Sequence, residues 1–267
     1  MDLFNLSKEI IILTGVSGNL GIKYAGELLK RYAVVIGIDL EKNKKIDDLK
    51  SKFPSTFLFL KCDITSKTQI EIVKQAIIKK YTFPTVLINN AAIDSPPSAP
   101  LEENGPFESY PEKSWEKIMD VNLKGVFLCC QVFGSVMALN KKGSIINISS
   151  IYGMLSPDQS IYEYKRKNGE EFYKPIGYSV SKAGIINMSR YLSSYWARTG
   201  VRVNTLTLAG VENNQDEKFI EAYTSRIPIG RMANSEDYIG PIVFLSSKAS
   251  NYMTGANLVI DGGWTSI

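Results

Sequence analysis

Short runs of β-branched and other apolar residues alternate along the chain with longer segments of helical periodicity. Seven of these runs have the length and composition of buried strands, namely residues 9–14, 33–39, 56–62, 85–89, 143–149, 202–208 and 257–260. Six intervening segments predict helices, namely 20–32, 43–52, 67–81, 113–140, 177–199 and 235–247. Strands this apolar need cover on both faces, so the alternation predicts an α/β fold with a doubly wound parallel sheet.

Two segments interrupt the alternation. Residues 92–112 are rich in Pro and Glu, and residues 156–175 are polar and aromatic. Each follows a predicted strand directly, and ligands of such sheets bind at the carboxyl ends of the strands. Both segments are therefore expected to overhang the binding crevice. The 267 residues are enough for one large core, so residues 1–267 are expected to form a single domain with a substrate-side insertion near 156–175.

Composition excludes several kinds of protein. The net charge of +4 comes from 31 basic and 27 acidic residues spread along the chain, which argues against a nucleic-acid partner. The chain has no histidine, and Cys62, Cys129 and Cys130 do not have metal-site spacing, so neither a metal site nor a histidine-based triad is expected. The apolar stretch near the N-terminus is too short for a signal segment or a membrane span, which predicts a soluble, cytoplasmic protein.

A glycine-rich turn links the first predicted strand to the first predicted helix. Gly15, Gly18 and Gly21 lie in the sequence TGVSGNLG, and such a turn lets the backbone approach a pyrophosphate at the N-terminus of the helix. Asp39 ends the second strand, where a carboxylate accepts hydrogen bonds from the adenosine ribose and repels a 2′-phosphate. The turn predicts a dinucleotide cofactor, and Asp39 favours NAD over NADP.

Tyr178 and Lys182 are four residues apart in a predicted helix, so they would share one face. The lysine charge would favour the ionised phenol, and Tyr178 would become a proton donor or acceptor near neutral pH. One such pair is expected by chance in a chain of this composition, so its meaning depends on the surrounding motifs.

Those motifs, in their order and spacing, resemble the short-chain dehydrogenase/reductase family over nearly the whole chain. They are TGVSGNLG at 14–21, Cys62-Asp63, NNAA at 89–92, VNLKGVF at 121–127, NISS at 147–150, YSVSK at 178–182, VRVNTL at 201–206 and the C-terminal TGANLVIDGG. The resemblance implies a single-domain Rossmann-type oxidoreductase that transfers a hydride between a nicotinamide cofactor and a secondary alcohol or ketone.

The resemblance also assigns residues to roles. Asn122, Ser150, Tyr178 and Lys182 match the catalytic tetrad of the family. Tyr178 would carry the proton, and Ser150 would bind the substrate oxygen. Lys182 would hold the nicotinamide ribose and lower the pKa of Tyr178, while Asn122 would anchor a water that links Lys182 to solvent. The implied cofactor contacts are Gly15, Ser17, Gly18, Asn19, Leu20, Gly21, Asp39, Asp63, Ile64, Asn90, Ala91, Tyr178, Lys182 and Val211.

The insertion at 156–175 makes the gap between Ser150 and Tyr178 unusually long for the compact branch of the family. It carries the basic run Lys165, Arg166 and Lys167. This run is either part of a solvated flap or a recognition site for an anionic group of the substrate. A similar insertion occurs in members encoded among bacterial surface-sugar genes, which points to a sugar or sugar phosphate as substrate.

Several alternatives stay open. A 3-oxoacyl thioester reductase has the same chemistry, although the charged insertion suits a long apolar ligand poorly. The glycine spacing, with Asn19 where the compact branch has its middle glycine, also resembles sugar-nucleotide epimerases and dehydratases, but the chain ends soon after VIDGGW without the substrate domain of that branch. A nucleotide-sensing protein would not need the tetrad. The resemblance further implies a homotetramer or homodimer, with helix 177–199 and the last strand as interfaces.

Overall fold

The computed structural model describes residues 2–95 and 100–267, and a single sheet of seven parallel strands runs through its centre. The strands are β1 (Ile10–Thr14), β2 (Val34–Asp39), β3 (Phe57–Lys61), β4 (Val86–Asn89), β5 (Gly143–Ser150), β6 (Val201–Leu208) and β7 (Asn257–Ile260). Their order is β3-β2-β1-β4-β5-β6-β7, which confirms the predicted doubly wound sheet. Because the order reverses between β1 and β4, the crevice for a ligand is expected at the carboxyl ends of these two strands.

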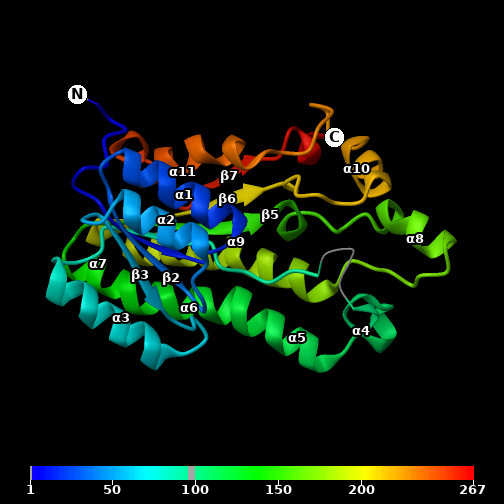
Figure 1. Cartoon of the computed structure of the whole chain (residues 1–267), viewed down its shortest axis with the longest axis horizontal. Coiled ribbons are helices and arrows are strands. Elements are labelled where there is room, and N and C mark those ends of the chain that lie inside the picture. Colours follow the sequence, from blue (N-terminus) through cyan, green and yellow to red (C-terminus); the bar gives the residue numbers. More distant parts are fainter. Residues whose placement is uncertain (1, 96–99) are drawn as a thin grey trace.

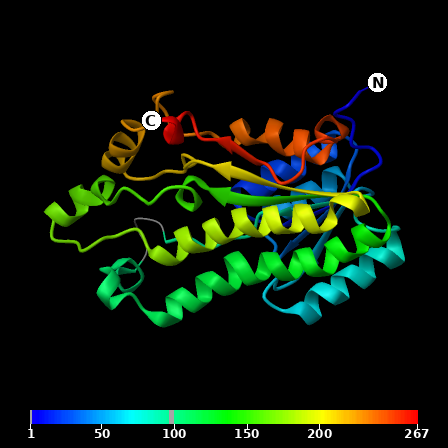
Figure 2. The same ribbon diagram turned by 180° about the vertical axis from the view of Figure 1, so that it is seen from behind.

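Helices cover both faces of the sheet (Figures 1 and 2). They are α1 (Asn19–Lys30), α2 (Lys44–Lys52), α3 (Lys67–Lys80), α4 (Leu101–Asn104), α5 (Glu112–Met119), α6 (Val126–Cys129), α7 (Ser135–Leu139), α8 (Glu163–Lys167), α9 (Ile176–Trp196), α10 (Glu217–Thr224) and α11 (Ile239–Ser246). One layer contains α1, α2 and α11, and the other contains α3, α5 to α7 and α9. The six helices expected from the sequence are all present, whereas α4, α8 and α10 were not foreseen.

Each helical layer has its own apolar core against the sheet. On the side of α1 and α11, Leu28 and Ile242 pack with Leu13 of β1. On the other side, Ile70 of α3 and Ile185 of α9 pack with the opposite face of the strands. Burying one such side chain contributes about 1.5–3 kcal/mol, so these two cores hold the strand ends in fixed positions.

The helix predicted at 113–140 is interrupted. Helical structure runs from Glu112 to Leu139, but Asp120–Gly125 and Cys130–Gly134 are π-helical. A π segment differs from an α-helix in having i→i+5 hydrogen bonds, which the spacing of apolar residues does not reveal. By length and composition this helix could cross a membrane, with a mean hydropathy of 1.5, but 56% of its apolar window is buried inside the protein, as expected for a core helix.

A third apolar cluster lies beyond the carboxyl ends of β5 and β6. Tyr162 and Phe172 of the insertion pack there with Phe219 of α10 and with Trp264 near the C-terminus. In Figure 1 these segments, together with α8, extend from the end of the sheet where β5 and β6 terminate. The insertion is therefore packed on its own small core beyond the strand ends.

Candidate active site

The glycine turn has the shape that a pyrophosphate requires. Gly15 has a φ of +66°, a left-handed conformation that favours glycine, and a Cβ on Gly21 would lie 2.1 Å from the carbonyl oxygen of Gly15. Gly18 precedes α1, whose first turn has no acidic residue and whose N-terminus receives no side-chain cap. The free N–H groups at this end, which begins with Asn19 and Leu20, therefore suit a phosphate.

Asp39 lies beside this turn at the end of β2. Its carboxylate accepts hydrogen bonds from the N–H groups of Ser17 (2.9 Å) and Leu40 (2.8 Å). The amide of Asn43 donates to the carbonyl of Ser17 at 2.9 Å, which fixes the turn from the other side. These contacts hold a negative charge next to the phosphate site, where the adenosine ribose of a dinucleotide would lie.

The segment after β4 closes the opposite side of the crevice. Thr14 Oγ1 accepts from the N–H groups of Asn90 and Ala91, both at 2.9 Å, and the Asn90 amide donates to the carbonyl of Gly15 at 3.1 Å. The structure thus brings Asn90 and Ala91 against the glycine turn, as the family pattern implied. Thr14 is the residue that holds them, and sequence reasoning assigned it no role.

Asp63 and Ile64 lie further out. Asp63 accepts from the N–H and the hydroxyl of Thr65, both at 2.8 Å, which shapes the loop after β3. Ile64 is buried against Gly125, where a Cβ would lie 2.7 Å from Ile64 Cδ1. Neither residue lines the cavity around Tyr178.

Tyr178 and Lys182 share one face of α9, as their spacing predicted. The Lys182 ammonium lies 5.6 Å from the centre of the Tyr178 ring and donates to the carbonyl of Ile148 at 2.9 Å. Lys182 is only 3% exposed. Burial lowers its pKa to about 8, with Asp94 acting in the opposite direction, so the side chain is still mainly cationic at neutral pH.

Ser150, the last residue of β5, completes the group at the phenol. It is buried, and its hydroxyl lies close to the phenol of Tyr178. Burial raises the pKa of Tyr178, and the charge of Asp94 raises it further, whereas the neighbouring Ser150 hydroxyl acts in the opposite direction. Loss of water around the phenolate thus raises the pKa of Tyr178 in this structure, and a lowering by Lys182 together with a bound nicotinamide stays a prediction.

Asn122 is connected to Tyr178 through hydrogen bonds of other residues rather than by direct contact. It is fully buried in the π-helical segment, where its amide donates to the carbonyl of Ile93 (2.9 Å) and accepts from the N–H of Ile93 (2.8 Å). It also donates to Ser181, whose hydroxyl donates to the carbonyl of Tyr178. The side chain of Asn122 thus ties the segment after β4 to α9.

A cavity of about 300 Å³ lies between these elements. Six of the residues expected to be catalytic or cofactor-binding line it, namely Leu20, Asn90, Ser150, Tyr178, Lys182 and Val211. Its other lining includes Asp94, Tyr152 and Lys174, which sequence reasoning did not assign to the site. Lys174 could have been noticed as the basic residue of the insertion nearest to Tyr178 in the sequence.

The basic run of the insertion does not line this cavity. Lys165 pairs with Glu170 at 2.8 Å, and Arg166 donates to two backbone carbonyls, those of Phe172 (2.9 Å) and Gln159 (2.7 Å). Lys167 is exposed, 3.8 Å from Glu163. In this structure these cations hold the fold of the insertion or face solvent, which favours the solvated flap over the recognition of an anionic substrate.

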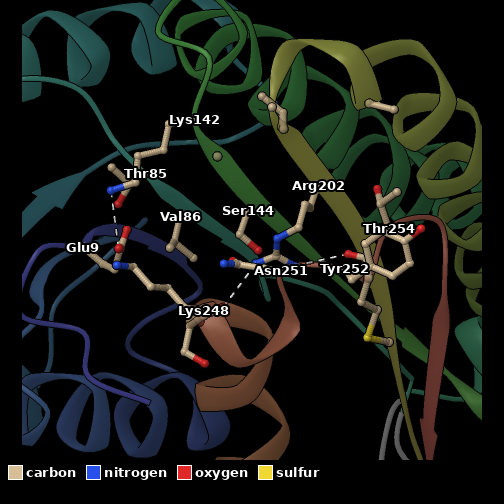
Figure 3. A pocket seen from close by; sticks show the side chains of 17 residues that line it. Glu9, Thr85, Val86, Lys142, Ser144, Arg202, Lys248, Asn251, Tyr252 and Thr254 are labelled. Carbon is tan, nitrogen blue, oxygen red and sulfur yellow. Dashed lines mark hydrogen bonds and ion pairs between the residues drawn. The ribbon is translucent and has the colours of Figure 1, made fainter. Parts of the chain in front are cut away.

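Another cavity, of about 630 Å³, lies at the opposite end of the sheet, at the amino ends of β5 and β6 (Figure 3). Arg202 donates to the carbonyls of Leu245 (3.1 Å) and Met253 (3.3 Å), and Ser144 donates to the same Leu245 carbonyl (2.8 Å). These groups stabilise the last turn of α11 and the segment before β7, and parallel sheets bind ligands at the other end of their strands. The cavity at Tyr178 is therefore the candidate active site.

A dinucleotide turn, a carboxylate beside it and a buried tyrosine–lysine–serine group at the crevice define a nicotinamide-dependent oxidoreductase. Comparisons with known proteins agree. A family model described as Enoyl-(Acyl carrier protein) reductase matches residues 15–265. Post-translational flagellin modification protein A of Campylobacter coli is 31% identical over 265 residues, which cover 97% of this chain and 99% of that protein.

Two further relatives have names or descriptions that mention the cofactor NAD. An NAD-dependent glycerol dehydrogenase of Listeria innocua is 31% identical and covers 98% of this chain and 96% of its own length. A short-chain dehydrogenase of Leptospira borgpetersenii, solved with bound NAD+, is 32% identical with a TM-score of 0.85, over 98% of this chain and 94% of that chain. The chain belongs to the short-chain dehydrogenase/reductase family, and it is an oxidoreductase that transfers a hydride between a nicotinamide cofactor and an alcohol or ketone carbon.

Proposed function

We propose that the protein interconverts a secondary alcohol and a ketone of a sugar-sized substrate, with NAD as the preferred cofactor and Tyr178 as the proton carrier. The observation that carries this proposal is the placement of Tyr178, Ser150 and Lys182 around one cavity at the end of a dinucleotide crevice. An activity screen with NAD and NADP against polyols, sugars, sugar phosphates, nucleotide sugars and acyl thioesters tests it. Turnover confined to acyl thioesters would refute it.

Each side chain has a distinct part in this chemistry. The nicotinamide, when bound, supplies or accepts the hydride. Tyr178 gives a proton to the substrate oxygen in ketone reduction, for which its neutral phenol is ready, and takes it back in alcohol oxidation. Ser150 lies beside the phenol and donates a hydrogen bond to the same oxygen. Lys182 holds a positive charge near Tyr178, and its N–H groups not used by Ile148 would bind the nicotinamide ribose.

The preference for NAD follows from Asp39, and we expect NADH to bind more tightly than NADPH. A carboxylate at this position repels the 2′-phosphate of NADPH. Asp39→Asn keeps the side-chain shape and one oxygen that can accept from Ser17, so it should narrow the difference in affinity by about tenfold. Fluorescence titration of both cofactors measures this. Asp47→Asn, in α2 and paired with Lys42, serves as the control and should leave the difference unchanged. Tighter binding of NADPH by the parent protein would overturn the assignment of Asp39.

Thioester reduction is the runner-up within the same chemistry. A 3-oxoacyl thioester has an alkyl chain, with no hydroxyl group, on one side of its reacting carbon. The cavity instead contains the charged side chains of Asp94 and Lys174 next to Tyr178. Placing an apolar chain against charges removes their water without replacing its hydrogen bonds, which is costly. The cavity therefore favours a hydroxylated substrate.

We also propose that the protein is cytoplasmic and self-associates as a homodimer or homotetramer through α6, α7 and α9. Phe127, Leu139, Tyr191 and Tyr195 are exposed on these helices, and the rings of Tyr191 and Tyr195 stack with centroids 6.1 Å apart. Such an apolar surface is typical of an interface between copies. Sedimentation velocity should show an oligomer, and a monomer at micromolar concentration would contradict the proposal.

A further inference from the structure

Lys174 reaches from the end of the insertion into the catalytic cavity. Its ammonium lies 5.0 Å from the centre of the Tyr178 ring and 6.0 Å from that of Tyr152. It pairs with Asp94 Oδ1 at 2.5 Å and donates to the carbonyl of Ser95 at 3.3 Å. Tyr178 therefore lies between two lysines, Lys182 from its own helix and Lys174 from the insertion.

The insertion is built to hold Lys174 in this position. The side chain of Gln159 accepts from the N–H of Lys174 at 2.8 Å and donates to its carbonyl at 3.1 Å, so both backbone groups are clamped. Arg166 in turn donates to the carbonyls of Gln159 and Phe172. Arg166 of the basic run thus helps to hold Lys174, which is the lysine of the insertion that lines the cavity.

Asp94 is fixed from the other side of the crevice. It follows Ile93, whose N–H and carbonyl are both bound by the Asn122 amide. Its Oδ1 accepts from Lys174 and from the N–H of Ser95, at 2.5 and 2.7 Å, while the described residues donate nothing to Oδ2. Two elements far apart in the sequence therefore place a carboxylate and an ammonium side by side at the phenol.

The exposure of the two groups indicates what they bind. The Asp94 side chain is 43% exposed, whereas that of Lys174 is 6% exposed. The pair therefore offers an acceptor oxygen and, beside it, an ammonium with one N–H left over. A hydroxyl group can donate to the first and accept from the second, and both bonds are of the stronger, charge-assisted kind.

Charge balance favours a neutral ligand over an anion. An anionic group drawn to Lys174 would meet the more exposed carboxylate of Asp94 at the same place, and like charges repel. A neutral hydroxyl meets no such repulsion. Tyr152 adds a further polar group, because its buried hydroxyl lines the cavity without a hydrogen bond of ordinary geometry among the described residues, although Tyr162 is a close neighbour.

We propose that Asp94 and Lys174 bind a second hydroxyl of the substrate, next to the carbon that reacts at Tyr178, and so select a vicinal diol or polyol. This inference rests on the proposed oxidoreductase function and names its substrate class. The pair acts on specificity, because it would touch the substrate beside the reacting carbon, while Tyr178 moves the proton. A simple secondary alcohol would offer no hydroxyl to Oδ2 of Asp94 or to the remaining N–H of Lys174.

The test compares trans-1,2-cyclohexanediol with cyclohexanol, which share a ring and differ in the neighbouring hydroxyl. The parent enzyme should show a kcat/KM for the diol at least about tenfold above that for cyclohexanol. Asp94→Asn and Lys174→Met should each bring this ratio to within about threefold of one. Any effect of these changes on the pKa of Tyr178 applies to both alcohols and cancels in the ratio. NADH titration checks that both variants are folded and bind the cofactor.

Lys167→Met is the matched control, because Lys167 is a basic residue of the same insertion that is exposed and lies outside the cavity. It should keep the parent ratio. An equal kcat/KM for the two alcohols in the parent, or an unchanged ratio in both pair variants, would overturn the inference while the oxidoreductase function stands. Absence of turnover with these alcohols and with all polyols, sugars, sugar phosphates and nucleotide sugars of the activity screen, with either cofactor, would instead refute the proposed function, and the inference with it.

Discussion

Replacing Tyr178 by Phe should lower kcat by about 100-fold or more, the scale of a lost acid–base catalyst. The change removes one oxygen from a side chain whose ring is already packed near Lys174 and Lys182, so the cavity keeps its shape. Cofactor affinity should stay within about twofold because we expect the phosphates and the adenosine ribose to be bound chiefly by the glycine turn and Asp39. Steady-state kinetics and NADH titration measure the two quantities.

Tyr32→Phe is the control for this experiment. Tyr32 is exposed in the turn between α1 and β2 and does not line the catalytic cavity. It should retain the parent kcat. If Tyr178→Phe lost cofactor affinity in proportion to kcat, the phenol would be a binding group, and its assignment as proton carrier would be wrong.

Replacing Gly21 by Ala should weaken NADH binding at least tenfold and lower the free energy of unfolding by about 2 kcal/mol. The new Cβ would lie 2.1 Å from the carbonyl oxygen of Gly15 and 2.8 Å from Cα of Val16. Both neighbours are backbone, so the glycine turn itself must move. We expect the turn to bind the phosphates of the cofactor, so cofactor binding and stability should fall together.

Gly26→Ala provides a control in the same helix. A Cβ on Gly26 meets only Leu49 Cδ2, at an ordinary 3.9 Å, and alanine favours a helix interior by up to about 1 kcal/mol over glycine. This variant should be as stable as the parent or more so, with unchanged NADH affinity. Urea unfolding of both variants checks the contrast, and a Gly21→Ala protein that binds NADH like the parent would rule out the close approach of the turn.

The sequence predicted the sheet and the positions of its strand ends well. A strand that is buried on both faces needs a continuous apolar run, such as the one ending at Asp39. Such a run can be recognised in the sequence itself. The pairing of Tyr178 with Lys182 is likewise local, since one helix turn brings them together. The motif residues at the strand ends then meet because the doubly wound topology collects them at one edge.

What the sequence did not predict depends on contacts between distant segments. Lys174 and Asp94 are 80 residues apart and meet only because the insertion folds back over the crevice. The density of positive charge from Lys165 to Lys167 suggested a recognition site for an anion. The neighbouring Glu170 and Glu163 neutralise part of this charge. The raised pKa of Tyr178 was not predicted either. It comes from burial in a closed cavity, which the helical periodicity of the sequence does not show.

The central claim is that Tyr178 moves the proton during hydride transfer, and a single-turnover experiment tests it most directly. Enzyme loaded with NAD is mixed with whichever of glycerol, xylitol and D-arabinitol the parent oxidises fastest, and NADH formation is followed through the first turnover. Parent enzyme should form NADH at least about 100-fold faster than Tyr178→Phe, with cofactor saturating in both. First-turnover rates equal within a few-fold would contradict the account, because the phenol would then have no part in the chemical step.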